Sequence, residues 1–286
     1  MPLFGAHMSA AGGPDQALHA AALFGMEACQ LFSKNNKQWK AAPLQDEVIK
    51  EFTRVWKQLG VQYTVAHASY LINMATKNDV LLNQSLAAII DELVRADQLG
   101  LNAVVVHPGT ASDADEEHAL LRVSQAVDAV MLALPKLKTK LLLETTAGQG
   151  KSIGHAFKQL GTILQRAKKG KKVGICLDTC HVFAAGYALS PISDYQATMK
   201  EFDEEIGLDR LAMLHVNDSV KGLGCRVDRH AHLGTGSIGI EGLKNIVSDQ
   251  RLKDLPMILE TPKGIGPEGK EWDAVNLALL RELALS

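Results

Sequence analysis

The chain has 286 residues, 47% of them hydrophobic, and a formal net charge of −2 at pH 7. This composition supports a substantial core and shows no chain-wide basic character, so any nucleic-acid-binding surface must be local. The N-terminus lacks a signal-peptide pattern and no apolar run is long enough to cross a bilayer, so we expect no membrane partner. The four cysteines, Cys29, Cys176, Cys180 and Cys225, are too few and scattered for a disulfide framework, which favours reduced thiols and a cytoplasmic protein.

One unit recurs along the chain: a short apolar strand, a polar loop and a segment with helical periodicity. Strands are expected at residues 3–6, 29–32, 63–66, 103–106, 140–143, 173–177, 211–214 and 257–259. Helices are expected at about 15–24, 44–59, 80–99, 116–134, 153–168, 195–206, 240–247 and 273–283. These units predict an α/β protein, a closed (β/α)8 (TIM) barrel that forms a single domain over residues 1–286. A doubly wound open sheet is the alternative, but it usually has fewer units.

Titratable side chains stand at the carboxyl ends of six consecutive predicted strands. They are His67, His107, Glu144, Asp178, His215 and Glu260. Three further candidates, His181, Asp228 and His230, lie in predicted loops on the same side. The last two are two positions apart, so both can turn inward if their loop is extended. Because the carboxyl ends of barrel strands face one pocket, we expect all of these side chains to converge there.

Taken singly, each of these residues is more often a hydrogen-bonded core histidine or a paired carboxylate than a metal ligand. As a set, five imidazoles and four carboxylates in one pocket cannot satisfy one another without cations, because the carboxylates repel. The set suits zinc, and also manganese or iron, and its size predicts two or three ions. We assign His19, His118 and His155 to surface helices, and His7 and His232 to supporting roles beside the ligands.

Two loops at the same end of the predicted barrel are candidates for contact with a nucleic acid. The stretch from Lys34 to Lys40 contains three lysines and Trp39, which could hold phosphates and pack against a base or sugar. The alternative is a solvated loop with the tryptophan anchored in the fold. Tyr70 and Leu71, after the third strand, could cap the barrel or wedge into a duplex. The most basic run, residues 168–172, precedes the sixth strand and is predicted to lie at the opposite end.

Five segments resemble the signatures of the endonuclease IV family, the zinc-dependent apurinic/apyrimidinic endonucleases of DNA repair. They are residues 5–13, 143–150, 177–187, 215–219 and 228–230, and the resemblance extends over essentially the whole chain. The resemblance implies a TIM barrel with three zinc ions. By this resemblance His67, His107 and Glu144 hold one ion; Glu144, Asp178, His215 and Glu260 hold a second; and His181, Asp228 and His230 hold the third. Manganese is possible at one site, because imidazole–carboxylate sites accept several ions.

The same resemblance implies an activity. Family members cut the phosphodiester bond on the 5′ side of an abasic site in double-stranded DNA, leave a 3′-hydroxyl and remove blocked 3′ ends. Glu144 and Glu260 are then the catalytic carboxylates, placed to bridge metals or to orient the attacking water. An abasic nucleotide has no base to unpair, so flipping it out of the helix costs little. Lys37, Tyr70 and Leu71 match the side chains that enter the gap, and we expect a monomer.

The chain departs from the family pattern at three positions. Lys37 stands where arginine is common, Ala68 where aspartate often follows the first histidine, and Thr145 where asparagine often follows the bridging glutamate. None is expected to touch a predicted ligand, so activity should survive while DNA affinity or lesion preference shifts. A sugar isomerase or epimerase on the same architecture is disfavoured by the five histidines and by the lack of a strand-end lysine. A non-catalytic lesion-binding module is disfavoured because all nine ligands are intact.

Overall fold

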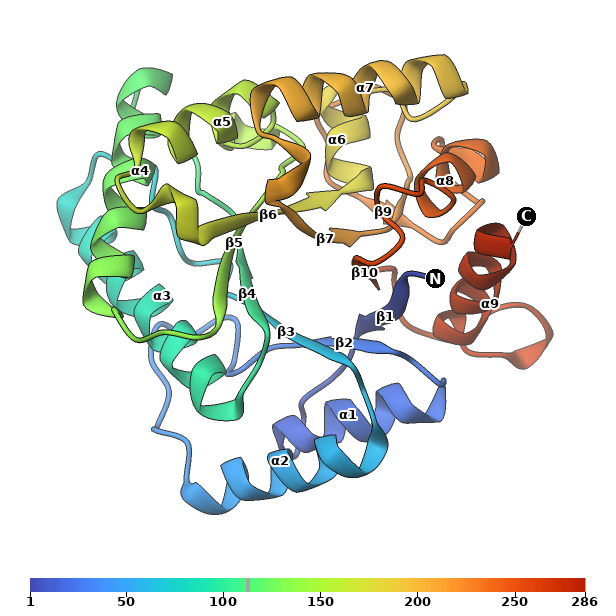
Figure 1. The fold of residues 1–286 in the computed structure, drawn as a ribbon, viewed down its shortest axis with the longest axis horizontal. Helices are drawn as coiled ribbons and strands as arrows, with labels where there is room; N and C mark the ends of the chain where they lie inside the picture. Colours follow the sequence, from blue (N-terminus) through green and yellow to red (C-terminus); the bar gives the residue numbers. More distant parts are fainter. Residues whose placement is uncertain (112–113, 286) are drawn as a thin grey trace.

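The computed structural model describes residues 1–111 and 114–285. Within them, eight parallel strands close into a barrel in the order β1-β10-β7-β6-β5-β4-β3-β2 (Figure 1). These strands are β1 (Leu3–His7), β2 (Ala28–Leu31), β3 (Tyr63–His67), β4 (Ala103–Val106), β5 (Lys140–Glu144), β6 (Val173–Asp178), β7 (Leu211–His215) and β10 (Pro256–Leu259). The barrel closes where Leu3 to Ala6 of β1 pair with Pro256 to Leu259 of β10. The predicted (β/α)8 barrel is confirmed.

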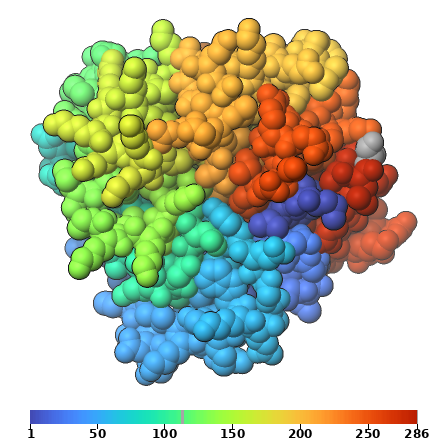
Figure 2. All heavy atoms as spheres, viewed as in Figure 1, coloured from blue at the N-terminus to red at the C-terminus, as the bar shows by residue number. Residues whose placement is uncertain are grey.

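Helices surround the barrel on all sides in Figure 1. They are α1 (Pro14–Leu23), α2 (Asp46–Leu59), α3 (Asp79–Leu99), α4 (Glu116–Ala133), α5 (Phe157–Arg166), α6 (Thr179–Ala185), α7 (Ile192–Glu205), α8 (Gly239–Val247) and α9 (Trp272–Leu285). Short 3-10 turns lie at η1 (Gln149–Lys151), η2 (Gly170–Lys172), η3 (Leu208–Arg210) and η4 (Pro267–Gly269). None of the helices in the described ranges has the length and apolar character needed to cross a membrane. On the face shown in Figure 2, the N-terminal segment (dark blue) lies against the C-terminal part of the chain (orange-red), which agrees with the pairing of β1 with β10.

The barrel interior explains why the strand-end residues converge. Its side chains form a small cluster of their own: Ala28, Val65, Ala103, Val105, Leu142, Cys176, Met213 and Ile258. Successive side chains alternate between the two faces of a strand, so the residue two positions later also points inward. From Val65 that residue is His67, and from Leu142 it is Glu144. The same step from Val105, Cys176, Met213 and Ile258 leads to His107, Asp178, His215 and Glu260.

Three features of the secondary structure differ from the prediction. The strands β3, β5, β6 and β7 each include their terminal ligand residue, because barrel pairing continues through it. The fifth helix begins at Phe157 rather than at 153, so His155 lies in the preceding loop and not on a surface helix. An additional helix, α6, follows β6 directly, and a short antiparallel hairpin, β8 (Asp218–Ser219) with β9 (His230–Ala231), lies outside the barrel.

Candidate metal centre

Six of the predicted ligands meet at the carboxyl end of the barrel, as expected. They are His67, His107, Glu144, Asp178, His215 and Glu260. Glu144, Asp178 and His215 are completely buried, whereas His107 and Glu260 remain partly open to solvent. The group is therefore mostly buried, and His107 and Glu260 are its members that still reach solvent.

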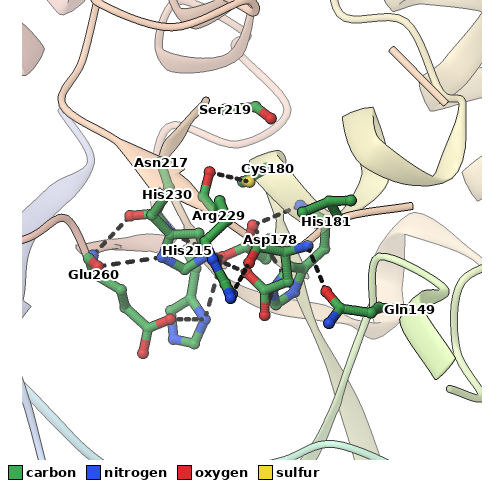
Figure 3. Close-up of polar contacts among 12 residues, drawn as sticks. Gln149, Asp178, Cys180, His181, His215, Asn217, Ser219, Arg229, His230 and Glu260 are labelled. Carbon is green, nitrogen blue, oxygen red and sulfur yellow. Dashed lines mark hydrogen bonds and ion pairs between the residues drawn. The ribbon is translucent and has the colours of Figure 1, made fainter. Parts of the chain in front are cut away.

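The other three predicted ligands reach the same group from outside the barrel strands. His181 was expected in a loop, but it lies on α6, because the Asp178 carboxylate caps this helix by accepting a hydrogen bond from the His181 backbone N–H at 2.8 Å. Asp228 lies in the loop between β8 and β9, and His230 begins β9, where it pairs with Ser219 of β8. Figure 3 shows His230 directed toward Asp178, His215 and Glu260.

Glu144 lies at the centre of the cluster, between two sets of imidazoles. Its Oε2 atom is 3.0 Å from Nε2 of His107 and 3.2 Å from Nε2 of His67. Its Oε1 atom is 2.8 Å from Nδ1 of His215 and 3.4 Å from Nδ1 of His181. Burial alone would raise the pKa of Glu144, but the neighbouring imidazoles of His215 and His107 lower it well below its usual range. The carboxylate is therefore ionised and presents one oxygen to each side.

Donor atoms from these residues form compact groups of the size that a metal ion requires. His67, His107 and Glu144 form one group, and Glu144, Asp178, His215 and Glu260 form another, each with donor atoms within 4.8 Å of one another. A third group joins His181 and His230 with Asp178. Asp228, which was expected in this third group, lies beside it, with Oδ2 at 3.1 Å from Nε2 of His181 and Oδ1 at 3.3 Å from Nε2 of His230.

The cluster has the chemistry of a site for divalent cations. Among the described residues, the Nε2 atoms of His181 and His230 are buried and make no well-aligned hydrogen bond, although the oxygens of Asp228 lie near both, so each can still bind another ligand. Four carboxylates share one pocket with five imidazoles, and mixed imidazole and carboxylate donors suit zinc and manganese. The residues present therefore fit a multinuclear metal centre.

Comparisons with known proteins cover almost the entire chain. A family model for xylose isomerase-like TIM barrels matches residues 18–283. The probable endonuclease 4 of Chloroflexus aurantiacus is 44% identical over 283 residues, which are 99% of this chain and 98% of the relative. That of Geobacter sulfurreducens is 40% identical over 98% of this chain and 93% of its own. The crystal structure of endonuclease IV from Thermus thermophilus is 38% identical, with a TM-score of 0.86 over 99% of this chain and 98% of that one.

This chain belongs to the endonuclease IV family. A D-tagatose 3-epimerase-like protein has the same fold, with a TM-score of 0.74 over 98% of this chain and 96% of that one, but its identity of 19% supports the likeness of fold alone. In the described part of the chain no barrel strand ends in lysine, one of the two residue types expected to transfer protons in the sugar-isomerase alternative. Family membership thus confirms the resemblance that the sequence motifs indicated.

Supporting residues that the sequence analysis missed hold the carboxylates in place. Asn217 donates through Nδ2 to Oδ2 of Asp178 at 2.7 Å, and its Oδ1 accepts from the backbone N–H of Glu260 at 2.8 Å. Gln30 of β2 contacts both His215 and Glu260. The alternation of side chains along a strand could have indicated both residues, because each lies two positions after a residue that points into the barrel. Asn217 lies two positions after His215, and Gln30 lies two positions after Ala28.

Two of the three departures from the family pattern do touch predicted ligands, so the expectation that none would is wrong. The backbone N–H of Asp178 donates to Oγ1 of Thr145 at 2.9 Å, and the carbonyl of Thr145 lies 2.8 Å from Nδ1 of His181. The carbonyl of Ala68 lies 2.8 Å from Nδ1 of His67. In both histidines the contact is with a backbone carbonyl, so a change of side chain at 68 or 145 leaves it available.

The loop from Lys34 to Lys40 differs from its predicted role at one position. The Lys34 side chain is only 1% exposed and its Nζ lies 2.6 Å from Oδ2 of Asp91. Lys34 therefore forms a buried ion pair within the protein and is not available to contact a phosphate. Lys37 and Lys40 are exposed, as a phosphate-binding role requires. Trp39 is partly buried and packs against the core, which agrees with the alternative of a tryptophan anchored in the fold.

Of the two predicted wedge residues, Tyr70 borders the candidate metal centre. Tyr70 is 62% exposed, although its ring centroid lies only 5.3 Å from that of His67. Leu71 beside it is partly exposed. An exposed aromatic ring directly above a buried ligand is available to a substrate that enters the pocket.

The remaining histidines lie where they were expected, apart from His155 and His232. His19 and His118 are exposed on α1 and α4. His232 was expected beside the ligands, but it stacks on Trp272, with ring centroids 3.6 Å apart. His7 is at the edge of the cluster, with Nδ1 at 3.9 Å from Glu260, and burial lowers its pKa to about 4. The basic run at 168–172 leads through η2 directly into the start of β6, at the end of the barrel opposite to the metal centre.

Proposed function

We propose that this protein is a metal-dependent phosphodiesterase that cuts double-stranded DNA on the 5′ side of an abasic site, leaving a 3′-hydroxyl. We further propose that it removes groups that block 3′ ends. The observation that carries the proposal is the convergence of all nine predicted donor residues around Glu144, in a chain that aligns over nearly its full length with endonuclease 4 relatives.

The proposed cofactor is a set of three zinc ions, with manganese able to replace zinc at one position. Three of the donor groups consist only of predicted ligands and support this number, with Asp228 completing the group of His181 and His230. Zinc ions in such a centre polarise phosphate oxygens, lower the pKa of water and stabilise a leaving oxygen.

We assign the two glutamates different tasks. Glu144 is completely buried and directs its two oxygens to different imidazole pairs, so it is the donor suited to bridge two metal positions. The Glu260 side chain is 14% exposed, with Oε2 3.3 Å from Nδ1 of His215. Because it reaches solvent at the pocket, Glu260 is placed to orient the water that attacks phosphorus.

Three exposed or partly exposed side chains would engage the DNA. Lys37 would contact the backbone phosphates, and Tyr70 and Leu71 would occupy the gap that the abasic nucleotide leaves. Their exposure and the closeness of Tyr70 to His67 support this assignment. We also propose that residues 1–286 act as a single domain, as a monomer and in the cytoplasm, where the four free thiols would stay reduced.

The proposal is tested by strand cleavage of a duplex that carries one abasic site, before and after chelator treatment and again after zinc is restored. We expect incision on the 5′ side, its loss with chelator and its recovery with zinc. A duplex without the lesion is the control substrate. Absence of incision by protein that holds three metal ions would contradict the proposed substrate and would make epimerisation of ketoses the next activity to assay.

A further inference from the structure

Gln30 is a buried polar residue inside the barrel, and it contacts two of the proposed ligands. It lies on β2, where it pairs with His7 of β1 and Val65 of β3, and it is 0% exposed. Its neighbour Cys29 faces outward, with its thiol 3.5 Å from the carbonyl of Ala17 on α1. Gln30 therefore faces inward, at the level of the strand-end ligands.

The amide of Gln30 has three polar neighbours. Its nitrogen Nε2 donates to Oε1 of Glu260 and lies 2.9 Å from Nδ1 of His7. Its oxygen Oε1 lies 2.8 Å from Nε2 of His215. Both amide hydrogens and the carbonyl oxygen thus face a partner, which satisfies a buried side chain that would otherwise be costly.

These contacts determine which atom of His215 carries a hydrogen. An ionised carboxylate can only accept hydrogen bonds, so the amide nitrogen of Gln30 must face Glu260. The amide oxygen must then face His215, and because this oxygen can only accept, Nε2 of His215 must carry a hydrogen. The orientation of the amide follows from the hydrogen-bonding chemistry of the three groups.

A hydrogen held on Nε2 leaves Nδ1 as the ring atom of His215 that can give a lone pair to a metal ion. That atom faces the cluster, at 2.8 Å from Oε1 of Glu144 and 3.3 Å from Oε2 of Glu260. The same amide engages Oε1 of Glu260, so the other oxygen, Oε2, is the one directed at His215 and the cluster. One buried side chain therefore orients two donors.

We propose that Gln30 is a positioning residue of the metal centre: it selects Nδ1 as the ligand atom of His215 and holds Glu260 with Oε2 toward the metal. The inference rests on the metal centre of the proposed function and deepens it, because it assigns a residue outside the nine ligands to metal retention. Hydrogen bonds of this kind to a metal-binding histidine typically change metal affinity by about 10–100-fold.

The test compares Gln30→Leu, which keeps the side-chain volume, and Gln30→Ala, which leaves room for water, with Gln159→Leu as the matched control. Gln159 is also a buried glutamine with hydrogen bonds through both amide atoms, but it joins Gly154 to Glu116 outside the cluster. Zinc affinity is measured by competition with a chromogenic chelator, and ¹⁵N NMR of zinc-loaded protein reports which nitrogen of His215 carries the hydrogen.

We expect both Gln30 variants to bind their weakest-held zinc ion about 10–100-fold less tightly. In both, His215 should no longer be restricted to the form with a hydrogen on Nε2. The Gln159 variant should lose a similar amount of stability but keep the zinc affinity and the His215 form of the unsubstituted protein. Unchanged zinc affinity together with an unchanged Nε2–H signal in a folded Gln30 variant would overturn the inference. If the unsubstituted protein itself binds no zinc, the proposed metal centre fails instead, and the two failures are distinguishable.

Discussion

The hydroxyl of Ser69 donates a hydrogen bond to the backbone carbonyl of Asn36 at 2.7 Å and thereby joins two loops whose residues are 33 positions apart in sequence. One loop carries Lys37 and the other carries Tyr70, so the proposed DNA-binding side chains are held relative to each other. Glu92 of α3 strengthens the connection by accepting from the Ser33 hydroxyl at 2.6 Å and from the Ser69 backbone N–H at 3.3 Å.

Substitution of Ser69 by alanine should weaken binding to abasic DNA without loss of metal. The lost hydrogen bond is worth about 1 kcal/mol, which corresponds to about fivefold in the dissociation constant if all of it appears in binding. Fluorescence anisotropy with an abasic duplex measures the affinity, and Ser193→Ala, on exposed α7, is the control. Equal affinity of the two variants would show that the loop connection does not preorganise binding.

Tyr70→Ala should reduce the affinity for abasic DNA by more, because the ring itself is removed. Stacking of an aromatic side chain on a base is worth about 1–3 kcal/mol, or roughly 5- to 150-fold in affinity. Tyr70→Phe keeps the ring and should bind nearly as well as the unsubstituted protein. Zinc content should be the same in all three proteins, and an alanine variant that binds as tightly as the phenylalanine variant would refute the wedge role.

Glu260→Gln should remove most of the cleavage activity, since the neutral amide cannot accept a proton from the attacking water. We expect a fall of about 10²-fold or more in the single-turnover rate at saturating zinc. Glu241→Gln, on the exposed start of α8, serves as the control. Cleavage by the Glu260 variant at the full rate would mean that another group orients the water.

Removal of metal should lower the thermal stability of the protein. Without cations, four carboxylates lie close together and the buried Nε2 atoms of His181 and His230 make no well-aligned hydrogen bond. A bound ion at about 1,000 times its dissociation constant adds about 4 kcal/mol of stability. Calorimetry with and without chelator measures the shift, which should be smaller for His230→Ala because this variant has already lost a ligand. If the unsubstituted protein unfolds at the same temperature with and without chelator, the fold is not stabilised by a bound metal.

Asp218→Asn should destabilise the loop that follows the hairpin. Asp218 is completely buried, and its Oδ1 accepts from the backbone N–H groups of Ser219 at 2.8 Å and Ile238 at 2.9 Å, while Oδ2 accepts from Gly234 and Gly236, both at 3.0 Å. An amide NH₂ in place of one oxygen would face donors, which costs about 1–3 kcal/mol. Urea unfolding should show this loss, and exposed Asp254→Asn should show none.

The local pattern of the chain was sufficient for the barrel and for the convergence of six strand-end side chains at one end of it. A strand that is apolar until it ends in histidine or a carboxylate, as at Val65 to His67, is a short-range signal, and the period of two residues directs the last side chain inward. Repetition of this signal along the chain predicted a common pocket before any contact was known, because parallel barrel strands all end at the same face.

Only the tertiary structure decided what surrounds those donors. The ion pair of Lys34 with Asp91, the hydrogen bond of Asn217 to Asp178 and the contact of Thr145 with His181 each join residues through space, so no local pattern reports them. The same holds for Gln30, whose contact with His215 bridges 185 positions in sequence. Residue identity and periodicity determine which side chains point into the barrel, but the hydrogen bonds that orient them depend on how distant segments pack.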